Sequence, residues 1–213
     1  LGLGDIKMAQ TIEIPESCYF SDYFKLNYYL EDIVTHFGYS FEPTSLALPK
    51  AEKTVETIDR LRQRLEESLP FVTLDSEAAR REFLIAPLVL ELVHLIHVKV
   101  KVSYSLKVTE QLKGLLDYYL QAGHNLLIIE AKDENLERGF KQLAAELIAL
   151  DKVTDPSAGN LLYGAVSIGR IWQFAVLDRQ QKKISQDLEL YRVPTDIEIL
   201  MRILVAILTG ESA

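Results

Sequence analysis

Three charged side chains stand in segments that are otherwise apolar. Glu130 and Lys132 close the run LLIIEAK, and Asp117 lies between apolar neighbours in the preceding run LLDYYLQA. Side chains alternate across a strand, so Glu130 and Lys132 point to the same face of a strand that contains both. Charged groups at the end of a buried strand are costly unless they are paired or bind a metal. These positions therefore indicate a functional site.

Asp117 and Glu130 are suited to share one hard divalent cation. Neighbouring strands of a hairpin can bring two carboxylates within reach of one ion, and Mg²⁺ or Mn²⁺ prefers carboxylate, carbonyl and water oxygens. Such a cation lowers the pKa of a bound water and neutralises charge on a phosphate. A lysine beside it, here Lys132, can orient the water or stabilise developing negative charge. The alternative is a strand-end ion pair between Glu130 and Lys132 with no catalytic role.

Hydrophobic periodicity predicts the elements that position these residues. Residues 97–106 alternate between polar and apolar side chains, which is typical of a strand with one solvated face. Strands at 115–122 and 126–132 follow, joined by a turn at 123–125, and the continuous apolar run of the second indicates burial on both faces. A helix over 136–150 is expected to pack on the sheet.

Helices are also predicted on the N-terminal side of these strands, at 21–37, 51–68 and 76–95. Ser76 is a good N-cap for the third helix, whose second half is apolar nearly all round. Pro87 falls inside it and should kink or locally distort it, because proline lacks the amide hydrogen that a helix interior needs.

On the C-terminal side we predict a hairpin around Ile168-Gly169, an edge strand within 182–193 and a final helix over 196–208. This order predicts an α/β fold with a mixed β-sheet flanked by helices. We divide the chain into an N-terminal helical extension (1–70), a core (71–193) and a C-terminal helix (194–213).

The final helix is apolar on more faces than one core requires. Ile199, Ile203, Val205 and Ile207 lie outside its main apolar stripe. The excess is expected to be covered either by the N-terminal extension of the same chain or by the same helix of a second copy. We favour the homodimer.

Composition bounds the class of protein. The chain has 213 residues, of which 48% are hydrophobic and 25% charged, and its single cysteine, Cys18, excludes a multi-cysteine zinc site. No apolar run is long enough to span a membrane and no signal peptide is recognisable, so we expect no membrane partner and a cytoplasmic location. The net charge of −8 arises mainly from residues 1–79, with 14 acidic and 7 basic side chains. No basic surface for nucleic acid is obvious.

The arrangement of Asp117, a short hairpin and Glu130-Ala131-Lys132 resembles the PD-(D/E)XK nuclease superfamily, which has the restriction-endonuclease-like fold. The segment GFKQLAAELIAL resembles the helix that carries a glutamine near the metal in many members, here Gln142. SEAARREFLIAP and YGAVSIGRIWQFAVLD are similar to the first helix and to the strand pair after the glutamine helix. The similarity extends over residues 76–178 and looks closest to small stand-alone bacterial members.

This resemblance implies a Mg²⁺- or Mn²⁺-dependent nuclease. It implies that Gln142 completes the catalytic site and that a glutamate of the first helix joins the metal ligands, with Glu77 the best match and Glu82 the alternative. The superfamily's proline before the aspartate is replaced by Leu116. A second hypothesis, favoured by the acidic N-terminal third, is a catalytically silent module of the same fold that binds a protein partner.

Overall fold

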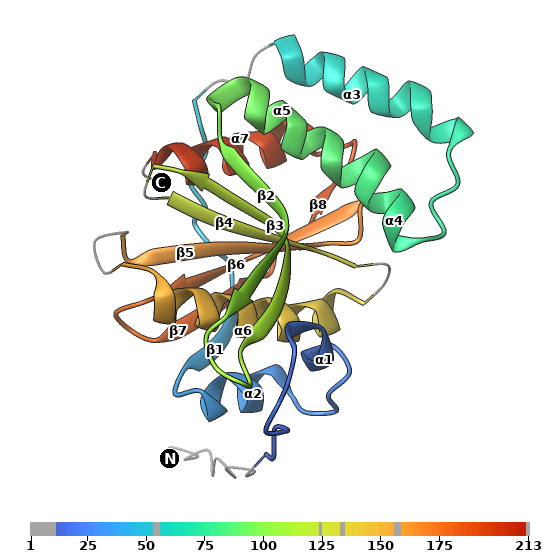
Figure 1. Cartoon of the computed structure of the whole chain (residues 1–213). Helices are drawn as coiled ribbons and strands as arrows, with labels where there is room; N and C mark the ends of the chain where they lie inside the picture. Colours follow the sequence, from blue (N-terminus) through green and yellow to red (C-terminus); the bar gives the residue numbers. More distant parts are fainter. Residues whose placement is uncertain (1–11, 53–55, 124, 133–134, 156–158, 212–213) are drawn as a thin grey trace, which may run out of the picture.

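A mixed β-sheet runs through the centre of the protein, with helices on both faces (Figure 1). The structure is a computed structural model that describes residues 12–52, 56–123, 125–132, 135–155 and 159–211. The strands of this part of the chain are β1 (Ser40–Thr44), β2 (Lys99–Lys107), β3 (Lys113–Ala122), β4 (Asn125–Ala131), β5 (Leu161–Ser167), β6 (Ile171–Asp178), β7 (Lys183–Asp187) and β8 (Tyr191–Arg192).

The strand order is β1-β7-β6-β5-β4-β3-β2, and the short β8 pairs with β6. β4 and β5 are parallel, as are β1 and β7, and the other pairs are antiparallel. The crossover between the parallel strands β4 and β5 is the helix α6 (Leu136–Val153). The predicted α/β class with a mixed sheet is therefore confirmed.

Two groups of helices cover the sheet. α1 (Phe20–Tyr23), α2 (Leu30–His36) and α6 share one hydrophobic core with the sheet. α3 (Glu56–Ser68), α5 (Ala86–Ile96) and α7 (Ile197–Thr209) share a second core on the opposite face (Figure 1). The short α4 (Glu77–Arg80) and a 3₁₀ turn (Leu69–Phe71) connect α3 with α5.

The single helix predicted at 21–37 is wrong, because residues 24–29 break it into α1 and α2. Two contacts fix this break. The carbonyl of Leu26 accepts a hydrogen bond from Lys141 Nζ at 2.9 Å instead of from a helical amide, and the Tyr28 hydroxyl donates to the carbonyl of Glu13 at 3.2 Å. The cost of interrupting the helix is offset by these bonds and by the packing of α1 on α6.

The N-terminal region does more than extend the core with helices. β1 adds a strand to the sheet next to β7, so the strand that we predicted as an edge within 182–193 has neighbours on both sides. α1 and α2 cover α6, while α3 contributes Ile58, Leu61 and Leu65 to the opposite core. The predicted start of the helix at 51–68 and the centre of the predicted turn at 123–125 include residues 53–55 and 124, which lie outside the described residues.

The distortion predicted at Pro87 is present. Residues Arg81–Ile85 form a π-helical turn between α4 and α5, and Pro87 occupies the first turn of α5. Proline has no amide hydrogen for the preceding carbonyls, and a wider turn accommodates this without ending the helix. Ser76 caps α4 as predicted, with its hydroxyl accepting from the amide of Ala79 at 3.1 Å.

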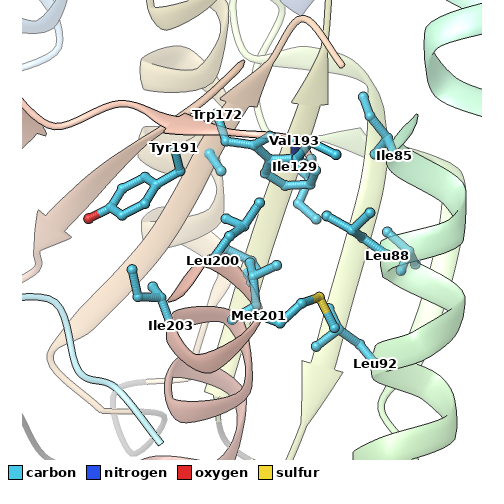
Figure 2. Close-up of a cluster of buried hydrophobic side chains, with 14 of the residues drawn as sticks. Ile85, Leu88, Leu92, Ile129, Trp172, Tyr191, Val193, Leu200, Met201 and Ile203 are labelled. Atoms are coloured by element: carbon cyan, nitrogen blue, oxygen red, sulfur yellow. The ribbon is translucent and has the colours of Figure 1, made fainter. Parts of the chain in front are cut away.

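The apolar faces of α7 are covered within one chain. Figure 2 shows Leu200 and Met201 of α7 on the side of Leu88 and Leu92 of α5, whereas Ile203 points away from these two leucines. Ile207 is buried as well, whereas Ile199 and Val205 are partly buried against the same core. Of the two expected covers, the structure shows α3 of the N-terminal extension packed on α7, together with α5 of the core. The homodimer therefore stays a prediction, which light scattering at micromolar concentration would test.

No helix in the described part of the chain is long and apolar enough to cross a membrane.

Candidate functional site

Asp117 lies at a break in the pairing of β2 with β3. On one side of Asp117, β3 packs into the core with α6, and on the other side it packs into the core with α5. Val102 pairs with Tyr118 and Tyr104 pairs with Leu116, which leaves Ser103 and Asp117 opposite each other without a pair. Ser103 has a left-handed φ of 52°. Tyr118 packs into the core with α5, whereas Leu116 packs into the core with α6. The strand alternation thus shifts at these two unpaired residues.

The pairing of β3 with β4 also ends at this point. Their ladder ends at the pair of Tyr118 and Ile129, so Asp117 comes next to Glu130. Asp117 Oδ2 accepts a hydrogen bond from the amide of Ala131 at 3.0 Å, and the side chain thereby takes a backbone donor that β3 leaves free. This hydrogen bond fixes the carboxylate at the point where the pairing between the two strands ends.

An arginine from the π-helical turn holds the other oxygen of Asp117. Arg81 Nη1 lies 3.3 Å from Asp117 Oδ1, and its guanidinium lies 5.4 Å from the ring centroid of Tyr118. Burial alone would lower the pKa of Arg81, but the charges of Asp117 and Glu77 and the hydroxyl of Tyr118 raise it. Arg81 therefore stays protonated and positively charged beside Asp117.

Glu130 and Lys132 lie at the end of β4, on the face covered by α6. The backbone of Lys132 continues the pairing with β5 by donating to the carbonyl of Ser167 at 2.8 Å. Its ammonium donates to Glu130 Oε1. The Glu130 side chain is 1% exposed and that of Lys132 is 12% exposed. The carboxylate is thus inside the protein, and the ammonium lies between it and the surface.

Helix α6 adds two polar side chains, Gln142 and Glu146, next to Glu130. Gln142 Nε2 donates to Glu130 Oε1 at 2.7 Å and to Glu146 Oε1 at 2.9 Å. Glu146 is fully buried, one helical turn beyond Gln142. A methyl group on Gly139 would meet Val166 Cγ1 at 2.6 Å, so a glycine at this position allows α6 to approach the sheet closely enough for these bonds.

Burial and mutual repulsion disfavour the charged forms of the two glutamates. Burial raises the pKa of Glu146 to about 8, and the charge of Asp117 adds to this, although the amide of Gln142 opposes it. Burial, with the charges of Glu146 and Asp117, raises the pKa of Glu130 well above its ordinary range, against the effect of Lys132. Burial would lower the pKa of Lys132, but Glu130 and the other carboxylates raise it.

Three oxygens of this cluster are buried and have no hydrogen-bond donor among the described residues. They are Glu130 Oε2, Gln142 Oε1 and Glu146 Oε2. Buried acceptors are almost always satisfied in folded proteins. Two carboxylate oxygens and one amide oxygen fit a hard divalent cation such as Mg²⁺ or Mn²⁺ in donor type. Within the described residues, no group of three or more His, Cys, Asp or Glu side chains is arranged to hold a metal, so the fit includes the amide.

Four predicted site residues, Asp117, Glu130, Lys132 and Gln142, belong to this set of contacts or adjoin it. Of the two first-helix candidates, Glu77 is partly buried and acts electrostatically on Arg81. Glu82 is exposed and lines a groove between α3 and α5.

Sequence reasoning missed Arg81 and Glu146 as members of the site. The sequence did hold one signal for Glu146. It follows Gln142 by four residues, so both side chains lie on the same face of a helix, within an otherwise apolar stretch.

Comparisons of the chain with protein-family models, with curated proteins and with solved structures returned no match.

Proposed function

We propose that the protein is a Mg²⁺- or Mn²⁺-dependent phosphodiester hydrolase that acts on nucleic acid and has a restriction-endonuclease-like core. The observation that carries this proposal is the cluster of Asp117, Glu130, Lys132 and Gln142 where the pairing of β3 with β4 ends. Its buried oxygens without donors are difficult to explain by stability alone, because each unsatisfied buried acceptor costs about 1–3 kcal/mol.

Each side chain has a role in this mechanism. Asp117 and Glu130 would hold the cation, and Glu77 is the first-helix ligand that the resemblance implies. The cation, when bound, supplies an activated water and neutralises phosphate charge. Lys132, whose side chain is 12% exposed against 1% for Glu130, orients the water or stabilises the charge that develops on the phosphate. Gln142 fixes the position of the Glu130 carboxylate through its 2.7 Å hydrogen bond.

Cationic and aromatic side chains of the β2–β3 hairpin support a nucleic-acid substrate. Lys99 and Lys101 are exposed on the edge strand β2. Lys101 Nζ lies 4.1 Å from the ring centroid of Tyr104 and 5.4 Å from that of Tyr119. Tyr119 pairs with Ile128, two residues before Glu130. Phosphate groups and bases that follow this hairpin would therefore pass close to the site.

The decisive test is cleavage of a panel of single- and double-stranded DNA and RNA with Mg²⁺ or Mn²⁺. Wild type should cleave at least one substrate, and Lys132→Ala should lose cleavage while keeping the fold by circular dichroism. Lys25→Ala, which changes a lysine whose side chain is 75% exposed, is the matched control and should cleave as wild type does. Full turnover by Lys132→Ala would remove the lysine from the mechanism.

Metal binding is tested separately by thermal unfolding. Mn²⁺ and Mg²⁺ should raise the melting temperature of wild type, because binding to the folded state alone stabilises it. Asp117→Asn should show a smaller rise. Equal shifts in the two proteins would contradict the assignment of Asp117 as a ligand.

A second candidate function is a catalytically silent module of the same fold that binds a protein partner. The observation in its favour is a groove of about 1230 Å³ between α3 and α5, with an apolar lining that includes Phe83 and Leu90. These two side chains are 47% and 69% exposed. Large apolar side chains exposed along a groove are typical of interaction surfaces. Under this hypothesis Phe83→Glu would abolish partner binding, and no substrate of the panel would be cleaved.

A further inference from the structure

We infer that Glu146 is a third carboxylate ligand of the divalent cation, acting with Glu130 and the amide oxygen of Gln142. This inference rests on the proposed function and deepens it, because the sequence assigned no role to Glu146. It starts from a geometric fact. One amide nitrogen, Gln142 Nε2, is within 2.7 Å of Glu130 Oε1 and within 2.9 Å of Glu146 Oε1. The two carboxyl groups therefore lie side by side inside the protein.

The remaining oxygens of the three side chains carry the argument further. Glu130 Oε2, Gln142 Oε1 and Glu146 Oε2 are all buried and accept no hydrogen bond from the part of the chain that the structure describes. The Gln142 oxygen is an independent observation, since a buried neutral amide would normally find a donor for its carbonyl. Three oxygen donors from two elements, β4 and α6, are thus available to one ligand, and a hard divalent cation is the ligand that takes only acceptors.

The charges of the cluster agree with this assignment. Three carboxylates, those of Asp117, Glu130 and Glu146, face two cationic side chains, Lys132 and Arg81. With all five groups ionised, the cluster would hold one excess negative charge in a buried place, where an uncompensated charge is costly, and the raised pKa values of the two glutamates reflect this cost. A bound divalent cation would change the net charge of the cluster from one negative to one positive charge. That is the charge required to bind a phosphodiester, which carries one negative charge.

The competing explanation is that the two glutamates share one proton and bind no metal. Both explanations neutralise the repulsion between Glu130 and Glu146, but only one depends on metal. Isothermal titration calorimetry with Mn²⁺ alone separates them and needs no substrate. The proteins to compare are wild type, Glu146→Gln, Asp117→Asn and Glu137→Gln. Glu137 is an exposed glutamate in the first turn of the same helix and gives the matched control.

The inference requires Glu146→Gln to weaken Mn²⁺ binding at least about 10-fold, since even outer-shell groups of metal sites contribute 10- to 100-fold. Glu137→Gln should bind as wild type does. Glu146→Asp, which keeps the carboxylate on a shorter side chain, should bind more weakly than wild type and more tightly than Glu146→Gln. Circular dichroism establishes that each variant is folded, and Glu146→Asp keeps the test valid if Glu146→Gln does not fold.

Two outcomes separate this inference from the proposed function. Wild-type affinity in Glu146→Gln together with weakened binding in Asp117→Asn would overturn the inference and leave the proposed metal site intact. Weakened binding in Glu146→Gln with wild-type affinity in Asp117→Asn would support the inference and move the metal away from Asp117. Absence of Mn²⁺ binding by wild type would overturn both.

Discussion

Glu146 and Asp151 lie five residues apart on α6 and both are buried, but they differ in how many of their carboxylate oxygens have hydrogen-bond donors. Asp151 accepts hydrogen bonds from the Tyr39 hydroxyl at 2.6 Å, from Arg179 Nε at 2.9 Å and from Lys182 Nζ at 2.6 Å. Burial would raise its pKa, but Lys182, Tyr39 and Arg179 together lower it. Glu146 has the amide of Gln142 as a donor and an oxygen without one, and its pKa is raised to about 8.

The difference teaches how a carboxylate that stabilises a fold can be distinguished from one that does not. At Asp151 both oxygens have donors, and the group ties α6 to the β6–β7 hairpin and to the N-terminal segment. At Glu146 the protein keeps an acid where burial and neighbouring charges oppose its ionisation. A residue that costs stability is expected to be retained for another purpose, and such perturbed groups are frequent at functional sites.

Loss of the Asp151 charge should give the largest change in stability. Asp151→Asn removes the charge that Arg179 and Lys182 contact, and truncating one partner of a buried ion pair costs about 3–5 kcal/mol. We expect the free energy of unfolding, measured with urea, to fall by this amount. A change below about 1 kcal/mol would show that the cluster is not the structural anchor described here.

Replacing Glu146 should have the opposite sign in the absence of metal. Glu146→Gln removes one of two adjacent buried carboxyl groups and offers an amide donor to Glu130, which should raise the free energy of unfolding by about 1–3 kcal/mol. The measurement is urea unfolding at pH 8 with a chelator. Destabilisation by Glu146→Gln would place Glu146 in the same class as Asp151 and remove the contrast between them.

The pH dependence of stability should separate the two carboxyl groups. The folded pKa of Glu146 lies above its ordinary 4.5, so the folded state binds the extra proton and stability should fall as pH rises from 4.5 to about 8. The folded pKa of Asp151 lies below its ordinary 3.8, so its contribution is present above 3.8 and is lost as pH falls through the folded pKa.

Chelator-treated variants provide the measurement. Unfolding free energies between pH 3 and 9 should show a smaller decline toward alkaline pH in Glu146→Gln, and a smaller decline toward acid pH in Asp151→Asn. Curves for the two variants that run parallel to that of wild type would refute both assignments.

The smallest effect is expected at the rim of the Asp151 cluster. The Lys182 side chain is 50% exposed, whereas that of Arg179 is 11% exposed. Solvent screens the exposed pair, so Lys182→Gln should cost less than about 1 kcal/mol. Arg179→Gln should cost more, because Arg179 also donates to the carbonyls of Thr154, Asp155 and Gly159. Equal costs in urea unfolding would mean that burial does not decide the strength of these bonds.

Local patterns were sufficient to predict the strands around the site and helix α6. The alternation in 97–106 and the apolar run before Glu130 correspond to β2 and β4, because strand periodicity reflects which faces are covered. Gln142 and Glu130 were placed together by the resemblance, and their side chains are in contact.

Contacts between distant segments could not be predicted in this way. The burial of Glu146 could not be predicted, because its place beside Gln142 and Glu130 depends on how α6 packs on the sheet. The interruption of the helix at 24–29 depends on Lys141, more than a hundred residues away. The pairing of Arg81 with Asp117 depends on a π-helical turn that a helical pattern alone does not reveal.

The π-helical turn has a consequence for how this chain can change by insertion and deletion. A π turn is one residue longer than the α-helical turn that it replaces, and one residue corresponds to about 100° of rotation around a helix. The extra residue lets Arg81 point to Asp117 while Leu88 and Leu92 point to the core. Loss of one codon within 81–85 would leave a regular helix. Such a helix could point either the arginine to Asp117 or the two leucines to the core, but not both. Descendants of this gene that lack the codon should therefore keep the fold and lose the arginine from the site.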